Sequence, residues 1–189
     1  MSLIKADVQL DAKGLACPMP IVRTKKAIAN LGEGMVIEVE ATDKGSKADL
    51  KAWAESTGNQ YLGTIEEGGI LRHYLRKSST EDKEERSFPD TISNEELEQM
   101  LNAKEPVVIL DVREEAEFAF GHIPGAVNIP LGELDSRQGE LDSEKLIVVI
   151  CRTGTRSDLA SQKLAEKGFG KVRNVLPGMS GWKGKTESI

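Results

Sequence analysis

The chain has 189 residues, 39% hydrophobic and 30% charged, which is typical of a soluble globular protein with one large domain or two small ones. Its net charge of -6 argues against direct binding to nucleic acid, because such binding usually leaves a basic surface. No apolar run approaches the roughly 18 residues of a spanning helix and the N-terminus is not apolar, so we expect a cytoplasmic protein without a membrane partner.

Six elements are predicted in the first 78 residues, from the period of the apolar positions. In chain order they are a strand around Val8 and Leu10, a helix at residues 18–30, a strand at 35–41, a helix at 46–57 and a hairpin that turns at Gly68 and Gly69. The order βαβαββ predicts a two-layer α/β sandwich, in which two helices cover one sheet.

A charged segment then interrupts the pattern. The stretch SSTEDKEERS, residues 78–87, contains six consecutive charged residues from Glu81 to Arg86. Such a run cannot contribute to a core, so we predict a solvated linker at residues 79–86 between domains at 1–78 and 87–189.

The second domain alternates strands and helices in a different way. Ser93 and Glu96 form a predicted capping box before a helix. The continuous apolar runs PVVILDV and LIVVI predict strands buried on both faces of a parallel sheet, and a helix at residues 158–167 follows the second run. We therefore predict an open parallel sheet flanked by helices, with a ligand site at the carboxyl ends of its strands.

The heptapeptide CRTGTRS, Cys151 to Ser157, follows the second apolar run at that end of the sheet. Successive backbone N–H groups, a helix predicted to be capped by Ser157, and the two arginines would together surround the sulfur with positive charge. This favours the nucleophilic thiolate over an inert buried cysteine. The predicted anion-binding residues are Arg152, Thr153, Gly154, Thr155, Arg156 and Ser157.

The spacing within this loop bears on which anion it holds. Cysteine phosphatases place five residues between cysteine and arginine, whereas four separate Cys151 from Arg156. The shorter ring suits a persulfide better than a phosphoryl group, which disfavours a phosphatase or an arsenate reductase. No histidine is needed as a base when the nucleophile is already ionised.

Three motifs in order resemble the rhodanese family: DVREEAEFAFGHIPGAVNIP from Asp111, CRTGTRS, and LPGMSGW from Leu176. The resemblance implies a rhodanese-like fold over residues 87–189 and a persulfide on Cys151, formed from thiosulfate or another sulfane-sulfur donor and held by the loop N–H groups. One departure is visible, because the family usually has two glycines before the final methionine and here Pro177, which lacks an N–H, precedes Gly178.

The stretch LDAKGLACPMP, Leu10 to Pro20, resembles the signature of TusA (SirA-like) sulfur carriers. Pro18 suits the first position of a helix, which would make Cys17 its N-cap with the sulfur over the positive end of the helix dipole. The resemblance implies that Cys17 carries sulfur.

Together the two halves suggest a sulfurtransferase that relays sulfur between Cys151 and Cys17, in a direction that the sequence leaves open. The donor could be thiosulfate, a low-molecular-weight persulfide or a protein persulfide, and the acceptor is open as well. The alternatives are a redox switch in which the two cysteines form a disulfide, and a non-catalytic docking module.

No cofactor is expected beyond the covalent persulfide. With only His73 and His122 and no C-x-x-C pattern, a metal site is not expected. We interpret His122 as a loop residue that fixes the backbone near Asp111. Arg113 and Glu117 are expected to form an ion pair beside the active loop, where Arg113 could also contact an anionic donor.

Overall fold

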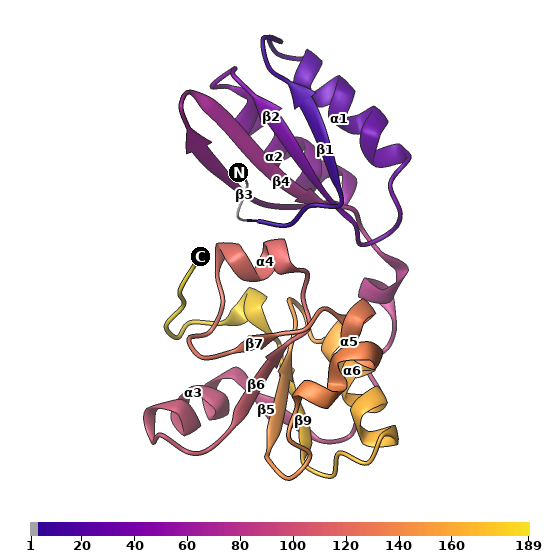
Figure 1. Cartoon of the computed structure of the whole chain (residues 1–189), viewed down its shortest axis with the longest axis vertical. Coiled ribbons are helices and arrows are strands. Elements are labelled where there is room, and N and C mark those ends of the chain that lie inside the picture. Colours follow the sequence, from indigo (N-terminus) through magenta and orange to yellow (C-terminus); the bar gives the residue numbers. More distant parts are fainter. Residues whose placement is uncertain (1–3) are drawn as a thin grey trace. The chain divides into compact units, whose positions relative to one another are not determined.

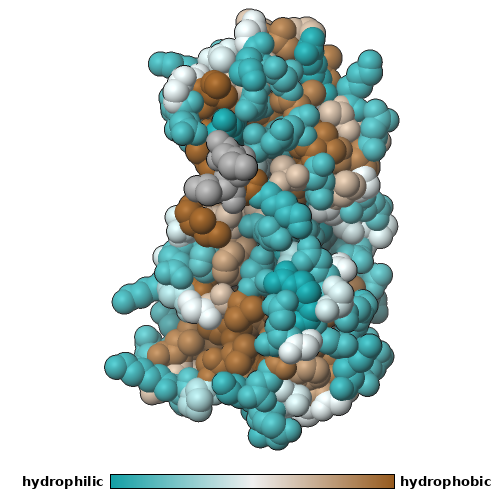
Figure 2. All heavy atoms as spheres, viewed as in Figure 1, coloured by the Kyte–Doolittle hydropathy of each residue, from teal (hydrophilic) through white to brown (hydrophobic). Residues whose placement is uncertain are grey.

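Figure 1 shows the protein as a computed structural model, which describes residues 4–189. The chain forms two compact units that divide between Thr80 and Glu81. Within residues 4–189, none of the helices combines the length and apolar character that crossing a membrane would require. Hydrophilic side chains cover much of the face viewed in Figure 2, as the high content of charged residues leads one to expect.

The first unit has the predicted order βαβαββ. Its elements are β1 (Val8–Ala12), α1 (Met19–Ala29), β2 (Val36–Ala41), α2 (Ser46–Thr57), β3 (Gln60–Glu67) and β4 (Ile70–Arg76). The sheet order is β1-β2-β4-β3, with β1 and β2 parallel and the other pairs antiparallel. The predicted hairpin turn is confirmed, because Gly68 and Gly69 both have positive φ, at 60° and 79°.

One face of this sheet forms the core of the first unit with both helices. Ile37 and Val39 of β2 are fully buried and pack in one cluster with Ile28 of α1 and Leu50 and Ala54 of α2. The alternation in β2 therefore directs every second side chain towards the helices. This packing brings the start of α2 to the same end of the unit as the loop before α1.

The second unit is a five-stranded, wholly parallel sheet of order β5-β9-β8-β6-β7. Its strands are β5 (Thr91–Ser93), β6 (Val108–Asp111), β7 (Val127–Asn128), β8 (Ile147–Ile150) and β9 (Val172–Leu176), and its helices are α3 (Asn94–Asn102), α4 (Glu115–Phe120), α5 (Leu134–Arg137) and α6 (Thr155–Glu166). Short 3₁₀ turns lie at Thr80–Lys83, Leu131–Glu133, Gln138–Glu140 and Met179–Gly181. The predicted open parallel sheet with flanking helices and the capping box of Ser93 and Glu96 are both confirmed.

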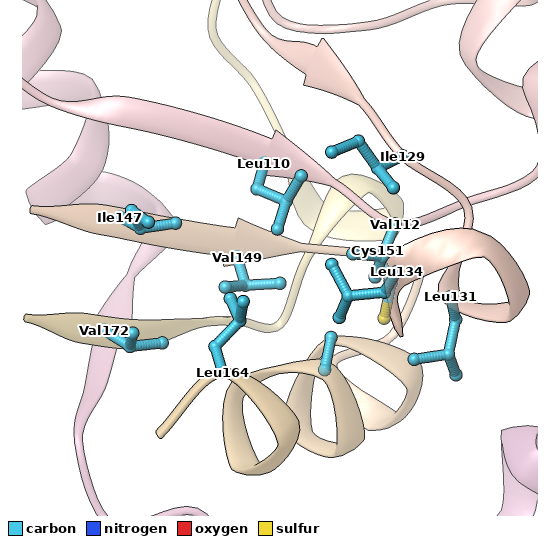
Figure 3. Close-up of a cluster of buried hydrophobic side chains, with 11 residues drawn as sticks. Leu110, Val112, Ile129, Leu131, Leu134, Ile147, Val149, Cys151, Leu164 and Val172 are labelled. Carbon is cyan, nitrogen blue, oxygen red and sulfur yellow. The ribbon is translucent and has the colours of Figure 1, made fainter. Parts of the chain in front are cut away.

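The central strands of this sheet are buried on both faces, as their continuous apolar sequences predict. In β8, Ile147 and Val149 belong to one core cluster, whereas Val148 and Ile150 belong to the cluster on the opposite face. Figure 3 shows the first cluster, with Cys151 at the end of β8 among its apolar side chains. The strand therefore carries the cysteine to the rim of a rigid core.

Most of the charged segment is exposed, as expected of a solvated linker, but some groups in it and directly after it make defined contacts. The backbone N–H groups of Ser87 and Phe88 donate to the carboxylate of Asp158, at 3.1 and 2.8 Å. Asp82 lies 3.4 Å from the guanidinium of Arg156, and Arg86 donates to the Thr153 carbonyl at 3.4 Å. The run of charges fails to reveal this docking because its partners lie about 70 residues further along the chain.

Candidate active site

Cys151 lies directly after β8, is buried, and faces the amino-terminal end of α6. The backbone N–H of Gly154 donates to its Sγ at 3.1 Å, and the Oγ of Ser157 lies 3.3 Å from the same sulfur. Gly154 has a φ of +92°, a conformation that favours glycine and that directs its N–H back towards Cys151. The loop is therefore built to stabilise negative charge on this sulfur.

Ser157 is not the helix cap that the sequence predicts. The helix begins at Thr155 and Gly154 is its N-cap, which places Ser157 in the first turn. There its hydroxyl donates to Oδ1 of Asn174 on β9, at 2.6 Å, and Asn174 in turn donates to the Gly154 carbonyl at 3.1 Å. Asn174 is not among the predicted site residues, because its one signal in the sequence is an amide within the strand sequence VRNVL.

Arg156, one of the predicted anion-binding residues, is paired with a carboxylate of the protein. Its guanidinium is buried and donates two hydrogen bonds to the carboxylate of Glu117, at 2.7 and 2.9 Å. Burial alone would lower the pKa of Arg156, but its charge pairing and hydrogen bonds with Glu117, helped by nearby Asp82, outweigh burial and raise that pKa. The side chain of Arg156 is therefore already neutralised, and Arg152, which is exposed, is the arginine of the loop that faces solvent.

The predicted ion pair between Arg113 and Glu117 is wrong, because Arg113 pairs with Asp111 instead. Nη2 of Arg113 donates to that carboxylate at 2.6 Å and to the Gly121 carbonyl at 2.8 Å. Both charged side chains are buried. Arg113 therefore fixes the loop after β6. Acidic residues lie on both sides of Arg113 in the sequence, and the sequence alone does not indicate which of them it pairs with.

A second loop, Gly178 to Ser180, lines the cysteine loop from the end of β9. The N–H groups of Met179 and Ser180 donate to the carbonyls of Cys151 and Arg152, at 2.8 and 2.9 Å. Gly178 has a φ of +95°, and a Cβ there would lie 2.5 Å from the Cys151 carbonyl oxygen. Pro177 leaves these N–H groups in place, so the departure from the family pattern does not open this side of the site.

Cys17 is exposed and lies in a different electrostatic environment. Its thiol donates to the carboxylate of Asp49 at 2.7 Å, and its backbone N–H donates to the carboxylate of Asp43 at 3.2 Å. The hydrogen bond to Asp49, with some burial and the charges of both carboxylates, raises the pKa of the Cys17 thiol. Neither carboxylate is among the predicted site residues, since neither is near Cys17 in the chain.

The position of Cys17 also differs from the expectation by one residue. The N-cap of α1 is Pro18, and Cys17 therefore precedes the cap. The N–H and S–H groups of Cys17 donate to carboxylates, so Cys17 does not cap the helix. Close to it in sequence, the side chains of Met19 and Val22 on α1 are 43% and 50% exposed.

The two histidines have structural contacts. The ring of His73 is buried and hydrogen-bonds to Ser46 at Nε2 and to Tyr61 and Thr64 at Nδ1. His122 stacks on Phe118 and forms hydrogen bonds with the carbonyl of Phe118 and with Glu187, so it does not fix the backbone at Asp111 as expected.

Comparison with known proteins identifies the family. A model described as sulfurtransferase TusA matches residues 8–77, and one described as a rhodanese-like domain matches residues 93–185. A Bacillus subtilis (strain 168) protein named "Putative sulfur carrier protein YrkF" is 53% identical over 185 residues, covering 98% of this chain and 100% of that protein. The chain belongs to the family that fuses a TusA domain to a rhodanese domain.

Further relatives match each half. The "Sulfur carrier protein TusA" of Allochromatium vinosum is 46% identical over 72 residues, 38% of this chain and 95% of that protein. A crystal structure of a rhodanese-like domain protein from Staphylococcus aureus superposes with a TM-score of 0.50 and 30% identity, covering 53% of this chain and 98% of that one. The TusA–rhodanese fusion is thus a sulfur-transfer protein, as its motifs predict.

Proposed function

We propose that Cys151 takes a sulfane sulfur from thiosulfate or a low-molecular-weight persulfide and passes it to Cys17, which delivers it to an acceptor thiol. The observation that carries the proposal is the N–H of Gly154 directed at the Cys151 sulfur, at 3.1 Å, in a loop that opens α6. An amide in this position stabilises a sulfur anion without needing a base.

In the first step the Cys151 thiolate attacks the outer sulfur of thiosulfate. A new S–S bond forms, the S–S bond of thiosulfate breaks, and sulfite leaves with the electron pair. The persulfide that remains carries one negative charge, which the N–H groups of residues 152–156 stabilise. Arg152 is exposed and attracts the anionic donor, whereas Arg156 acts through the structure of the loop because Glu117 neutralises it.

In the second step the Cys17 thiol, which donates to Asp49, releases its proton to solvent, and the resulting thiolate attacks the outer sulfur of that persulfide. The sulfur passes to Cys17 and the Cys151 thiolate is restored, so no oxidant or reductant is consumed. The exposed Met19 and Val22 on α1 give the carrier an apolar surface close in sequence to Cys17, which fits delivery to a protein acceptor.

The test compares Cys17→Ser with Cys151→Ser after one turnover with thiosulfate. We expect Cys17→Ser to retain sulfur on Cys151, and Cys151→Ser to lose sulfur from both positions. Sulfur on Cys17 in the absence of Cys151 would contradict the order of the relay. A loss of two hydrogens in the unaltered chain, without added sulfur, would favour the disulfide switch instead.

A further inference from the structure

The carrier cysteine faces two carboxylates that come from different parts of the fold. Asp49 lies in the first part of α2 and accepts the Cys17 S–H at 2.7 Å, and Asp43 lies in the loop between β2 and α2 and accepts the Cys17 N–H at 3.2 Å. These are the two charged groups that act on the thiol. Both disfavour a negative sulfur, against the pull of the α1 amino terminus.

A buried network fixes the loop that carries Asp43 to the start of α2, the helix that carries Asp49. The Ser46 hydroxyl donates to the Asp43 carbonyl at 2.6 Å and lies 2.8 Å from Nε2 of His73. Ser46 and His73 are both buried in the first unit. The acidic surroundings of Cys17 are therefore part of the folded structure rather than a chance contact between mobile side chains.

The two cysteines therefore offer a persulfide anion different surroundings. At Cys151 an N–H donates to the sulfur, whereas at Cys17 a carboxylate accepts from it. An N–H donor stabilises the anion, and a carboxylate stabilises the protonated thiol and repels the anion. Sulfur is accordingly held more firmly at Cys151 than at Cys17.

We propose that Asp49 is the positioning residue that makes Cys17 a transient carrier: its carboxylate holds the empty carrier as a thiol and destabilises the loaded persulfide, so that sulfur leaves readily for an acceptor. This inference rests on the proposed relay. On delivery an acceptor thiolate attacks the outer sulfur of the Cys17 persulfide and receives it, and the S–S bond to Cys17 breaks. The Cys17 thiolate that is left takes a proton from solvent and donates it in a hydrogen bond to Asp49.

The first test measures the protonation of Cys17 directly, in the full chain with Cys151→Ser so that a single cysteine remains. The rate of alkylation by iodoacetamide is followed as a function of pH. Because the thiolate is the reactive form, we expect Asp49→Asn to move the midpoint to lower pH by about one unit or more. Asp49→Glu should stay near the unaltered midpoint.

A matched control removes a charge from the same helix without touching the cysteine. Glu55 lies on α2 and is exposed, and we expect Glu55→Gln to leave the alkylation midpoint unchanged. An unchanged midpoint in Asp49→Asn would overturn the assignment. If that variant fails to fold, the pKa of Cys17 is measured instead from the thiolate absorbance of the Cys151→Ser chain, in which Asp49 is intact. A Cys17 pKa at or below the ordinary value for cysteine would equally overturn the assignment.

The second test measures where the sulfur rests. In the two-cysteine chain loaded with one sulfur, we expect Asp49→Asn to raise the fraction of persulfide on Cys17 at equilibrium, and an unchanged fraction would contradict the proposal. If the relay itself fails, no sulfur reaches Cys17 in either chain while the alkylation midpoint still shifts. The two failures are therefore distinguishable.

Discussion

At the scale of single residues, the pair formed by Arg156 and Glu117 supports the loop that holds Cys151. Both side chains are buried, and two hydrogen bonds join them. Glu117→Gln would remove the buried counter-charge of the guanidinium and leave only the more exposed Asp82 beside it, and breaking such a buried pair costs about 3 kcal/mol. We expect the free energy of unfolding of the second unit to fall by about that amount in denaturant titrations.

The control for this substitution is Glu105→Gln, which removes the same charge at an exposed position. It should change the free energy of unfolding by less than about 0.5 kcal/mol. Equal stabilities for the two variants would show that Glu117 does not neutralise a buried arginine.

The residues that perform chemistry could be predicted from sequence, but their partners could not. Cys17 and Cys151 each lie in a short motif whose neighbours are adjacent in the chain. Asp49 reaches Cys17 across 32 residues, and Glu117 reaches Arg156 across 39. Local sequence patterns do not predict such pairings, because the two groups are distant in sequence and come together only in the folded structure.

At the scale of elements, the cysteine loop depends on its close approach to the loop after β9. A Cβ on Gly178 would lie 2.5 Å from the Cys151 carbonyl oxygen, so Gly178→Ala must displace one of the two loops. We expect persulfide formation on Cys151 to slow by about 100-fold, since misplacing a reacting group by 1 Å has this effect. Single-turnover assays with thiosulfate would measure it.

Gly168→Ala separates crowding from backbone strain. Gly168 has a φ of +93°, close to that of Gly178, but no atom lies within 4 Å of its Cβ position. The cost should be about 1 kcal/mol of stability with sulfur transfer retained. Full activity in Gly178→Ala would mean that the contact between the loops is not needed.

The helices and strands could be predicted from the periodicity of their apolar residues. Where a predicted helix end differs from the structure, the cause is local. The continuous run LIVVI gave a strand buried on both faces, as expected. Ser157 was expected to cap α6, but the glycine conformation at Gly154 starts the helix earlier and frees the serine for Asn174. The charged segment is largely exposed, as expected, and Asp158 binds the backbone N–H groups of Ser87 and Phe88, which directly follow it.

At the scale of the whole molecule, fusing a donor domain to its carrier would make sulfur transfer an event within one chain. A short tether supplies an effective concentration on the order of millimolar, well above micromolar protein. We expect the rate constant for arrival of sulfur on Cys17 to stay constant when the loaded protein is diluted tenfold. A rate that falls in proportion to protein concentration would indicate transfer between chains.

The sulfur relay is tested most directly by intact mass and peptide mapping after brief incubation of the reduced protein with thiosulfate. We expect a gain of about 32 Da on the Cys151 peptide, one sulfur on a nucleophilic thiolate, followed by its arrival on the Cys17 peptide. No added sulfur on Cys151 with thiosulfate or a glutathione persulfide, or sulfur that reaches Cys17 first, would contradict it.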